Sequence, residues 1–186
     1  MSNKKSAFTL IELLVVIVLI AVLAALLLTG ISAAMRLAKR VKATTEVKGL
    51  AAAIQQYYTE YRKWPQTTII DPEVEPVKIN GNVAKMLQGE DVPVKNNIKK
   101  TQFFTFQTFA NGDASQPVNP WYEAGTPTDD YYYYYKVDYN FDNKINGTGD
   151  ASSPPEKVVK RQVIVWTKDM KRSTPTKAVW IQSWDD

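Results

Sequence analysis

The sequence predicts an α+β fold in which one long N-terminal helix packs on a C-terminal antiparallel β-sheet. Two observations predict the helix. An uncharged, mostly apolar run extends from Leu13 to Met35, and apolar residues then recur at spacings of three and four up to Tyr61. A third observation predicts the sheet, because short β-prone segments follow residue 100 and are separated by Gly, Pro, Asn and Asp.

The first half of the expected helix, residues 8–35, is long enough to cross a bilayer, since about 20 apolar residues suffice. Glu12 is the carboxylate at the start of this segment, and Lys4 and Lys5 precede it. A carboxylate inside an apolar segment costs a few kcal/mol, so it requires a partner. We therefore expect this helix to pack against copies of itself in a membrane.

The second half of the helix, residues 36–64, is amphipathic. Its predicted buried stripe consists of Leu37, Val41, Thr44, Val47, Leu50, Ile54, Tyr57 and Tyr61. Trp64-Pro65 ends the pattern, because the residue before proline is disfavoured in helical geometry. We predict one helix from about Phe8 to Arg62, roughly 80 Å long. Gly30 and Gly49 each weaken it by about 1 kcal/mol relative to alanine.

The rest of the chain, residues 65–186, is expected to form one globular α+β domain. Residues 65–100 are predicted to be a connection with a short helix around Val83 to Gln88, closed by Gly89. Strands are predicted at 101–109, 131–139, 158–167 and 178–184. The continuous apolar run within 162–166 favours a central strand.

The composition of the 186 residues restricts the possible functions. The chain has no Cys and no His. Disulfides, thiolate metal sites and nucleophiles activated by histidine are therefore excluded, and we expect no enzyme. The 23 basic and 19 acidic residues give a net charge of +4, which becomes +2 if Lys4 and Lys5 are removed. A balance this small does not indicate nucleic-acid binding.

Three interpretations of the N-terminus compete. A secretory signal peptide has an apolar region of about 7–15 residues, shorter than the run found here. A plain membrane anchor explains the length but leaves Glu12 without a purpose. The third interpretation uses all the residues: Lys4-Lys5-Ser6-Ala7 followed by Phe8-Thr9-Leu10-Ile11-Glu12-Leu13-Leu14-Val15-Val16 resembles the class III signal of type IV pilins and type II secretion pseudopilins.

This resemblance implies how the chain is processed and assembled. A prepilin peptidase would cut between Ala7, where glycine is usual, and Phe8, and the new amine of Phe8 would be methylated. Residues 1–7 would be the leader, residues 8–35 a single inner-membrane span that later forms the filament core, and residues 65–186 a periplasmic or extracellular head. Glu12 would pair with the methylated amine of Phe8 in a neighbouring copy.

The function implied is that of a structural subunit of a pseudopilus or pilus in a type II secretion-like system, which drives protein export across the outer membrane. Its partners would be copies of itself, the assembly platform and minor pseudopilins. Residues 57–65 and Val118-Asn119-Pro120-Trp121-Tyr122 are similar to segments of the major, G-type pseudopilin, with Asn119 replacing an acid. The alternatives are a type IV pilin for motility, adhesion or DNA uptake, and a membrane-anchored enzyme or binding domain.

Four cations conflict with the orientation that the resemblance implies. Arg36, Lys39, Arg40 and Lys42 follow the apolar run, and a positive-inside count would place the head in the cytoplasm. The signal before Phe8 must face the cytoplasm to be cut, so we expect a periplasmic head. The cations would then contact lipid phosphates or neighbouring acidic side chains.

One metal-like spacing is present. Asp138, Asn140 and Asp142 alternate as in the first positions of an EF-hand-type calcium loop, and Asn146 and Asp150 follow. Asn143 replaces the usual glycine, and Gly149 stands where a bidentate glutamate is expected. Both a Ca²⁺ site and a plain turn remain possible, because Asp and Asn are also common at hairpin ends. Major pseudopilins use calcium in their C-terminal region, which favours the metal by resemblance.

Overall fold

The computed structural model describes residues 9–65, 75–90, 97–113, 116–142, 144–146, 158–170, 172–173 and 178–184. The chain divides into two compact units, Met1–Ala38 and Lys39–Asp186. We call residues 10–38 the stem and the unit that starts at Lys39 the head. Helix α1, Leu10–Tyr61, begins in the stem and ends in the head.

The long helix was predicted to within two residues at its start and one at its end. It ends because Arg62 adopts a left-handed conformation, with φ 54°. The Arg62 N–H still donates to the carbonyl of Tyr58 at 2.7 Å. Trp64 then turns back and stacks on the Tyr58 ring at 4.2 Å between centroids, which buries it beside the helix.

The head contains a four-stranded antiparallel sheet in the order β1-β2-β5-β6. The strands are β1 (Val77–Lys78), β2 (Tyr134–Val137), β5 (Val163–Lys168) and β6 (Trp180–Gln182). A separate hairpin pairs β3 (Ile145–Asn146) with β4 (Val158–Val159). The predicted central position of residues 162–166 is confirmed, since β5 lies between β2 and β6.

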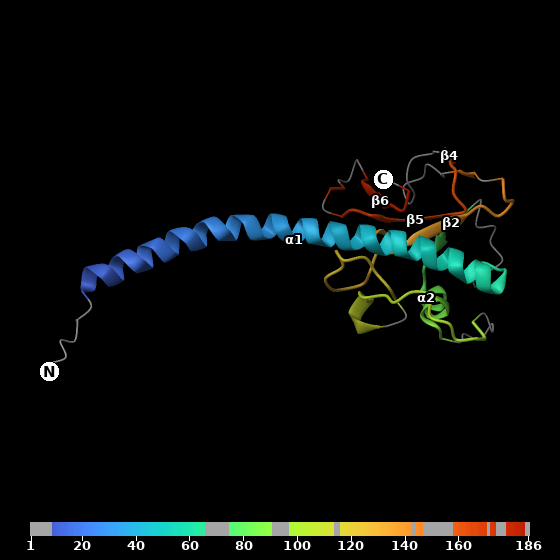
Figure 1. Cartoon of the computed structure of the whole chain (residues 1–186), viewed down its shortest axis with the longest axis horizontal. Helices are drawn as coiled ribbons and strands as arrows, with labels where there is room; N and C mark the ends of the chain where they lie inside the picture. The colour runs from blue at the N-terminus through green and yellow to red at the C-terminus, as the bar shows by residue number, and fades with distance from the viewer. Residues whose placement is uncertain are drawn as a thin grey trace, which may run out of the picture. The chain divides into compact units, whose positions relative to one another are not determined.

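The sheet buries both of its faces. One face, with Tyr135, Val137 and Val165, packs in the main core together with α1 and α2. The other face, with Ile164 and Trp166, packs against Ile145 and Val159 of the hairpin. Successive side chains of a strand point to opposite faces, so a strand covered on both sides has a continuous apolar sequence. In Figure 1, β2 and β5 run along one side of the C-terminal half of α1 and α2 lies on another side.

Helix α2, Gly81–Gln88, confirms the predicted short helix. The side chain of Asn80 caps its start by accepting from the N–H groups of Asn82 and Val83. Gly89 closes it in a left-handed conformation, with φ 87°, where glycine carries no steric penalty. A Cβ on Gly89 would also lie 2.9 Å from the carbonyl oxygen of Lys100, so the next loop packs directly over this turn.

Three secondary-structure predictions were wrong. Residues 101–108 form no strand, because the N–H groups of Phe103 and Phe104 donate to the carbonyl of Leu87 at the end of α2 instead of to a neighbouring strand. The predicted strand 158–167 is two strands of different sheets, separated by a turn in which the Arg161 N–H donates to the Val159 carbonyl. The predicted connection 65–100 contains β1, which pairs with β2.

The buried stripe of α1 is shorter than predicted. Val47, Leu50, Ile54 and Tyr57 have no exposed surface, but Leu37 and Val41 are 63% and 56% exposed. Ala43 is the first described residue of α1 that is fully buried. Gly49 has a packing role there, because an added Cβ would lie 3.0 Å from the edge of the Phe104 ring.

Candidate functional site

The start of α1 is organised by a reciprocal contact between Thr9 and Glu12. The backbone N–H of Thr9 donates to Oε2 of Glu12 at 2.9 Å, and its hydroxyl donates to the same oxygen at 2.6 Å. The N–H of Glu12 lies 3.4 Å from the Thr9 hydroxyl oxygen. This is a capping box, which satisfies N–H groups that have no partner within the helix.

The capping box was missed from the sequence, although the Thr9-x-x-Glu12 spacing is its usual signal. The two roles of Glu12 are compatible. Both hydrogen bonds from Thr9 reach Oε2, and among the described residues none donates to Oε1. Thr9 therefore holds the carboxylate at the end of the helix through Oε2, and within the described residues Oε1 has no donor. Ala7 and Phe8, the predicted processing residues, lie outside the described residues.

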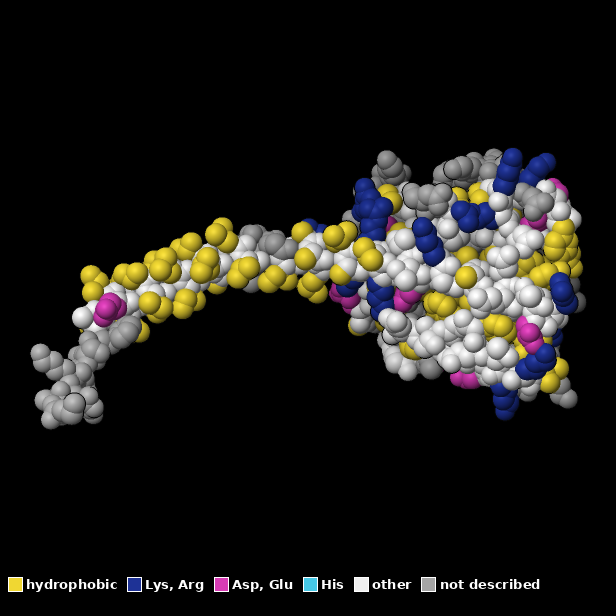
Figure 2. Space-filling model, viewed as in Figure 1, with side chains coloured by type: hydrophobic (Ala, Val, Ile, Leu, Met, Phe, Trp, Pro, Cys, Tyr) yellow, Lys and Arg dark blue, Asp and Glu magenta, His cyan; other side chains and the backbone are white. Residues whose placement is uncertain are grey.

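The apolar stem exposes hydrophobic side chains in every direction. Its large apolar residues between Leu10 and Leu27 are 45% to 82% exposed. Figure 2 shows hydrophobic side chains along this whole segment. Within the described residues, α1 is the one helix long and apolar enough to cross a membrane. An apolar surface of this extent requires lipid or other protein around it.

Three of the four cations that conflicted with the expected orientation have acidic partners in the head. Lys39 pairs with Glu123 at 3.2 Å. Arg40 lies 3.8 Å from the buried carboxylate of Asp169. These contacts match the expectation of neighbouring acidic side chains.

Lys42, the third of these cations, contacts two groups. It donates to the Thr108 hydroxyl at 3.1 Å and lies 3.9 Å from Glu46. The carboxylate of Glu46 in turn accepts a hydrogen bond from the hydroxyl of buried Tyr133. Lys39, Arg40 and Lys42 therefore join α1 to loops of the head.

Asn119 connects the segments that supply these acids. Its side-chain NH₂ donates to the Thr167 hydroxyl at 3.0 Å and to the Asp130 carbonyl at 3.2 Å. Its Oδ1 accepts from the N–H of Trp121 at 3.2 Å. Asn119 is fully buried, so the resemblance to an Asp-Pro-Trp segment concerns a structural position. An amide suits it because two of the partners are acceptors.

The predicted calcium residues lie in a tight turn after β2. Asp138 is fully buried, and its Oδ1 accepts from the N–H of Asp142 at 3.1 Å. Oδ1 of Asn140 accepts from the same N–H at 2.9 Å, which brings these two oxygens together. Oδ1 of Asp142 accepts from the N–H of Lys144 at 2.8 Å. Phe141 has φ 60°, an unusual value for an aromatic residue.

The remaining predicted ligands are Asn146 and Asp150. Asn146 contributes its backbone to β3, where it pairs with Val158. Asp150 lies outside the described residues. Within the described part of the chain, no three Asp or Glu side chains gather closely enough to hold a metal. One side-chain oxygen of each of Asp138, Asn140 and Asp142 accepts a backbone N–H, as the plain-turn interpretation expects.

Comparison with known proteins identifies the N-terminal segment. Residues 2–28 match the family model described as the prokaryotic N-terminal methylation motif. No curated protein and no solved structure matches the chain. The matched residues include the capping box at Thr9 and Glu12 and most of the apolar stem. The motif implies processing by a prepilin peptidase and assembly into a pilus-like filament, so the chain carries the prepilin-type signal of the type IV pilin-like proteins, the group that includes the pseudopilins.

Proposed function

We propose that this chain is a structural subunit that polymerises into the pseudopilus of a type II secretion-like system and drives protein export across the outer membrane. The observation that carries the proposal is a single carboxylate, Glu12, held at the start of an exposed apolar helix that bears a methylation motif. Such a helix is stable in lipid or in a bundle of similar helices.

Assembly depends on the pairing of two charges. When stems bundle, Glu12 enters an apolar environment, where an unpaired charge is strongly destabilising. The methylated amine of Phe8 in a neighbouring copy supplies the opposite charge, and Oε1 of Glu12 accepts it while Thr9 holds Oε2. Pairing makes burial of both charges tolerable and fixes the register of adjacent stems.

The orientation follows from processing. A signal that is cut before Phe8 on the cytoplasmic side places the stem across the inner membrane and the head in the periplasm. In this orientation Lys39 and Arg40 have acidic partners within the folded head. A periplasm-dependent reporter fused after residue 186 tests this orientation.

The pairing is tested by comparing Glu12→Gln and Glu12→Ala with Glu60→Ala, which removes a carboxylate from the head. We expect all three variants to insert and to show a methylated Phe8 by mass spectrometry. We expect the two Glu12 variants to lose most of their filament yield, with Glu60→Ala close to the parent chain. A normal yield from Glu12→Ala would contradict the pairing.

The secretion assignment is separable from polymerisation. Replacing the gene by a Glu12→Ala allele should stop export of proteins across the outer membrane and leave surface motility intact. Loss of motility, adhesion or DNA uptake with normal export would instead support a retractable type IV pilin, which shares the same N-terminal motif.

We also propose that a calcium ion stabilises the turn after β2. The donor set fits this ion, because Asp138, Asn140 and Asp142 supply hard oxygen ligands and two of these oxygens already converge. Asn146 and Asp150 are the further candidates. A bound ion stabilises the folded state by mass action, so the head should melt at a higher temperature in millimolar Ca²⁺ than in EDTA. Equal melting temperatures would refute the calcium site.

A further inference from the structure

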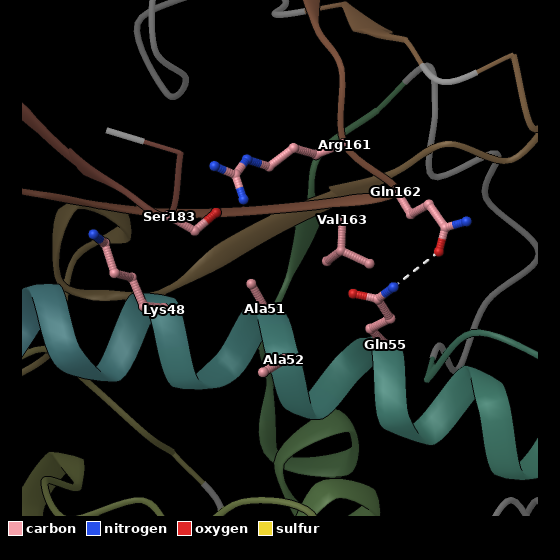
Figure 3. A pocket seen from close by; sticks show the side chains of 8 residues that line it. All are labelled: Lys48, Ala51, Ala52, Gln55, Arg161, Gln162, Val163 and Ser183. Carbon is pink, nitrogen blue, oxygen red and sulfur yellow. Dashed lines mark hydrogen bonds between the residues drawn. The ribbon is translucent and has the colours of Figure 1, made fainter. Parts of the chain in front are cut away.

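A groove of about 450 Å³ lies in the head between α1 and the strand β5. We propose that this groove is an interface that receives a carboxylate from a second copy of the chain; this inference rests on the proposed function. Figure 3 shows Lys48 of α1, Arg161 and Ser183 reaching toward one end of the groove. Two cations and a hydroxyl at one end form an environment suited to a carboxylate.

The other end of the groove is closed by two amides. Nε2 of Gln55 donates to Oε1 of Gln162 at 3.0 Å, so α1 and the residue before β5 are joined there. Ala52 contributes a small side chain to the wall on α1. The groove is therefore an open recess with a mixed polar and apolar lining and with its two cations at one end.

Lys48 has the charge and position to act in such an interface. Among the described residues, none pairs with its amine, whereas Lys39, Lys42 and Lys99 each have an acidic partner. Lys48 is exposed, and Arg161 is exposed opposite it. Two nearby positive charges attract an anion more strongly than either does alone.

A second copy is the occupant that the surface of the head favours. The head presents exposed carboxylates, and those of Glu123 and Asp129 are 75% and 76% exposed. Each forms an ion pair with a lysine of its own chain, Lys39 or Lys78, and an ion pair with so exposed a carboxylate contributes little to stability. The same protein thus displays both a cationic groove and acidic side chains, the complementarity required for a contact between unlike surfaces of identical subunits.

The groove also lies on the uncovered ridge of α1. Val41, Thr45, Lys48, Ala52 and Gln55 are exposed and follow one another at spacings of four and three, so they form one face of the helix. Val41 is an apolar member of this face and is 56% exposed. A ridge that the head leaves open along its length is available to a neighbouring subunit.

The experiment uses zero-length carbodiimide cross-linking of filaments of the full chain. This reagent converts a carboxylate into an O-acylisourea. A lysine amine then attacks the acyl carbon, the bond to the isourea oxygen breaks, and an amide forms with release of a urea and a proton. The dimer band is isolated by denaturing electrophoresis and its cross-linked peptides are identified by mass spectrometry. We expect an amide between Lys48 and an Asp or Glu, and the partner peptide identifies the acid.

Lys48→Arg is the matched control, because it keeps the charge but forms no stable amide with an activated carboxylate. It should assemble normally and lose this one cross-link. Lys48→Glu with Arg161→Glu places like charges in the contact and should lower filament yield about tenfold or more. Lys100→Glu with Lys144→Glu reverses two charges at exposed lysines that do not line the groove, and should assemble normally.

The outcomes separate the groove from the proposed function. Intermolecular amides at other lysines without any at Lys48, or normal filament yield from the double glutamate variant, would refute the groove and leave polymerisation standing. A Lys48 amide confined to the monomer band would also refute it. Absence of all filaments and all intermolecular cross-links from the parent chain would refute polymerisation itself, and the groove with it.

Discussion

The two halves of α1 share one continuous backbone but bury different amounts of apolar surface. In the stem, Leu13, Leu19 and Leu23 are each more than half exposed. In the head, Leu50, Ile54 and Tyr57 have no exposed surface. The head half is satisfied by partners from its own chain, whereas the stem half requires lipid or other chains. The same helix is thus part of a folded domain at one end and of an assembly at the other.

The transition between the halves does not coincide with the first polar residue. Leu37 and Val41 lie among cations and continue the three-and-four spacing, yet both are exposed. The head's first fully buried helix residue is Ala43. Burial therefore depends on where the head's side chains reach, and periodicity alone does not fix that position.

The largest expected effect distinguishes a buried leucine from an exposed one. Leu50→Ala should lower the free energy of unfolding of the head by about 2–5 kcal/mol, because it removes buried contacts and leaves a cavity. Leu19→Ala, the same change in the stem, should leave head stability unchanged. All five tryptophans lie in the head, so tryptophan fluorescence of the full chain in detergent, followed against denaturant, measures the head alone.

A loss of head stability in Leu19→Ala would show that the two halves unfold together. That result would contradict the distinction between the two halves of α1, because the stem would then unfold cooperatively with the head. An unchanged Leu50→Ala would mean that the head does not depend on the buried face of α1.

The second prediction concerns Asn119, which links the segments whose acidic side chains pair with Lys39 and Arg40. Asn119→Ala removes the donor to Thr167 and Asp130 and leaves the N–H of Trp121 without its acceptor. Unpaired buried polar groups cost about 1–3 kcal/mol, so the head should be destabilised by that amount in the same fluorescence assay. Asn119→Asp should be at least as damaging at neutral pH, since a carboxylate cannot donate to the Asp130 carbonyl. A fully stable Asn119→Asp would show that this position accepts the acid found in the similar segment.

Much of the fold was predictable because its signals are local. The apolar run and the three-and-four spacing predicted α1, and the segment from Val83 to Gln88 followed by Gly89 predicted α2. The contacts between residues far apart in the sequence were not predictable. The aromatic residues at 103–106 suggested a strand, but their N–H groups found the free carbonyl of Leu87, a partner that only the folded chain brings near.

In the candidate site, too, local contacts were predictable and long-range contacts were not. Glu12 was singled out because a charge in an apolar run is conspicuous, and its contact with Thr9 spans only three residues. The groove between Lys48 and Arg161 joins residues more than a hundred positions apart, and no sequence spacing indicates it. The candidate calcium ligands were selected by their spacing, and the same spacing also builds the hydrogen-bonded turn.

The third prediction compares threonines in the two halves of α1. Thr9→Ala removes the hydroxyl of the capping box and should destabilise the helix start by about 1 kcal/mol. Amide hydrogen exchange at residues 10–13 should become several-fold faster in detergent, with head stability unchanged. Thr45→Ala is the control, because its hydroxyl donates only to the Val41 carbonyl within the helix, a bond that adds little. Equal exchange in Thr9→Ala and the parent chain would mean that the capping box is not formed in detergent.

The smallest effect is expected at a surface ion pair, and it tests whether buried contacts hold the head. The Lys78 amine donates to Asp129 at 2.9 Å, and this hydrogen bond together with the positive charge lowers the pKa of the Asp129 carboxyl. A lowered pKa in the folded state means that the stabilisation is present above the ordinary pKa of aspartate and is lost as the pH falls through the folded value. Asp129→Asn should therefore reduce stability by less than about 1 kcal/mol at pH 7. The difference from the parent chain should shrink in about 1 M salt, where the Debye length is only ~3 Å, and should disappear on acidification. A larger loss of stability in Asp129→Asn than in Leu50→Ala would reverse this ranking. The ion pair at β1 would then contribute more to the stability of the head than the buried face of α1 does.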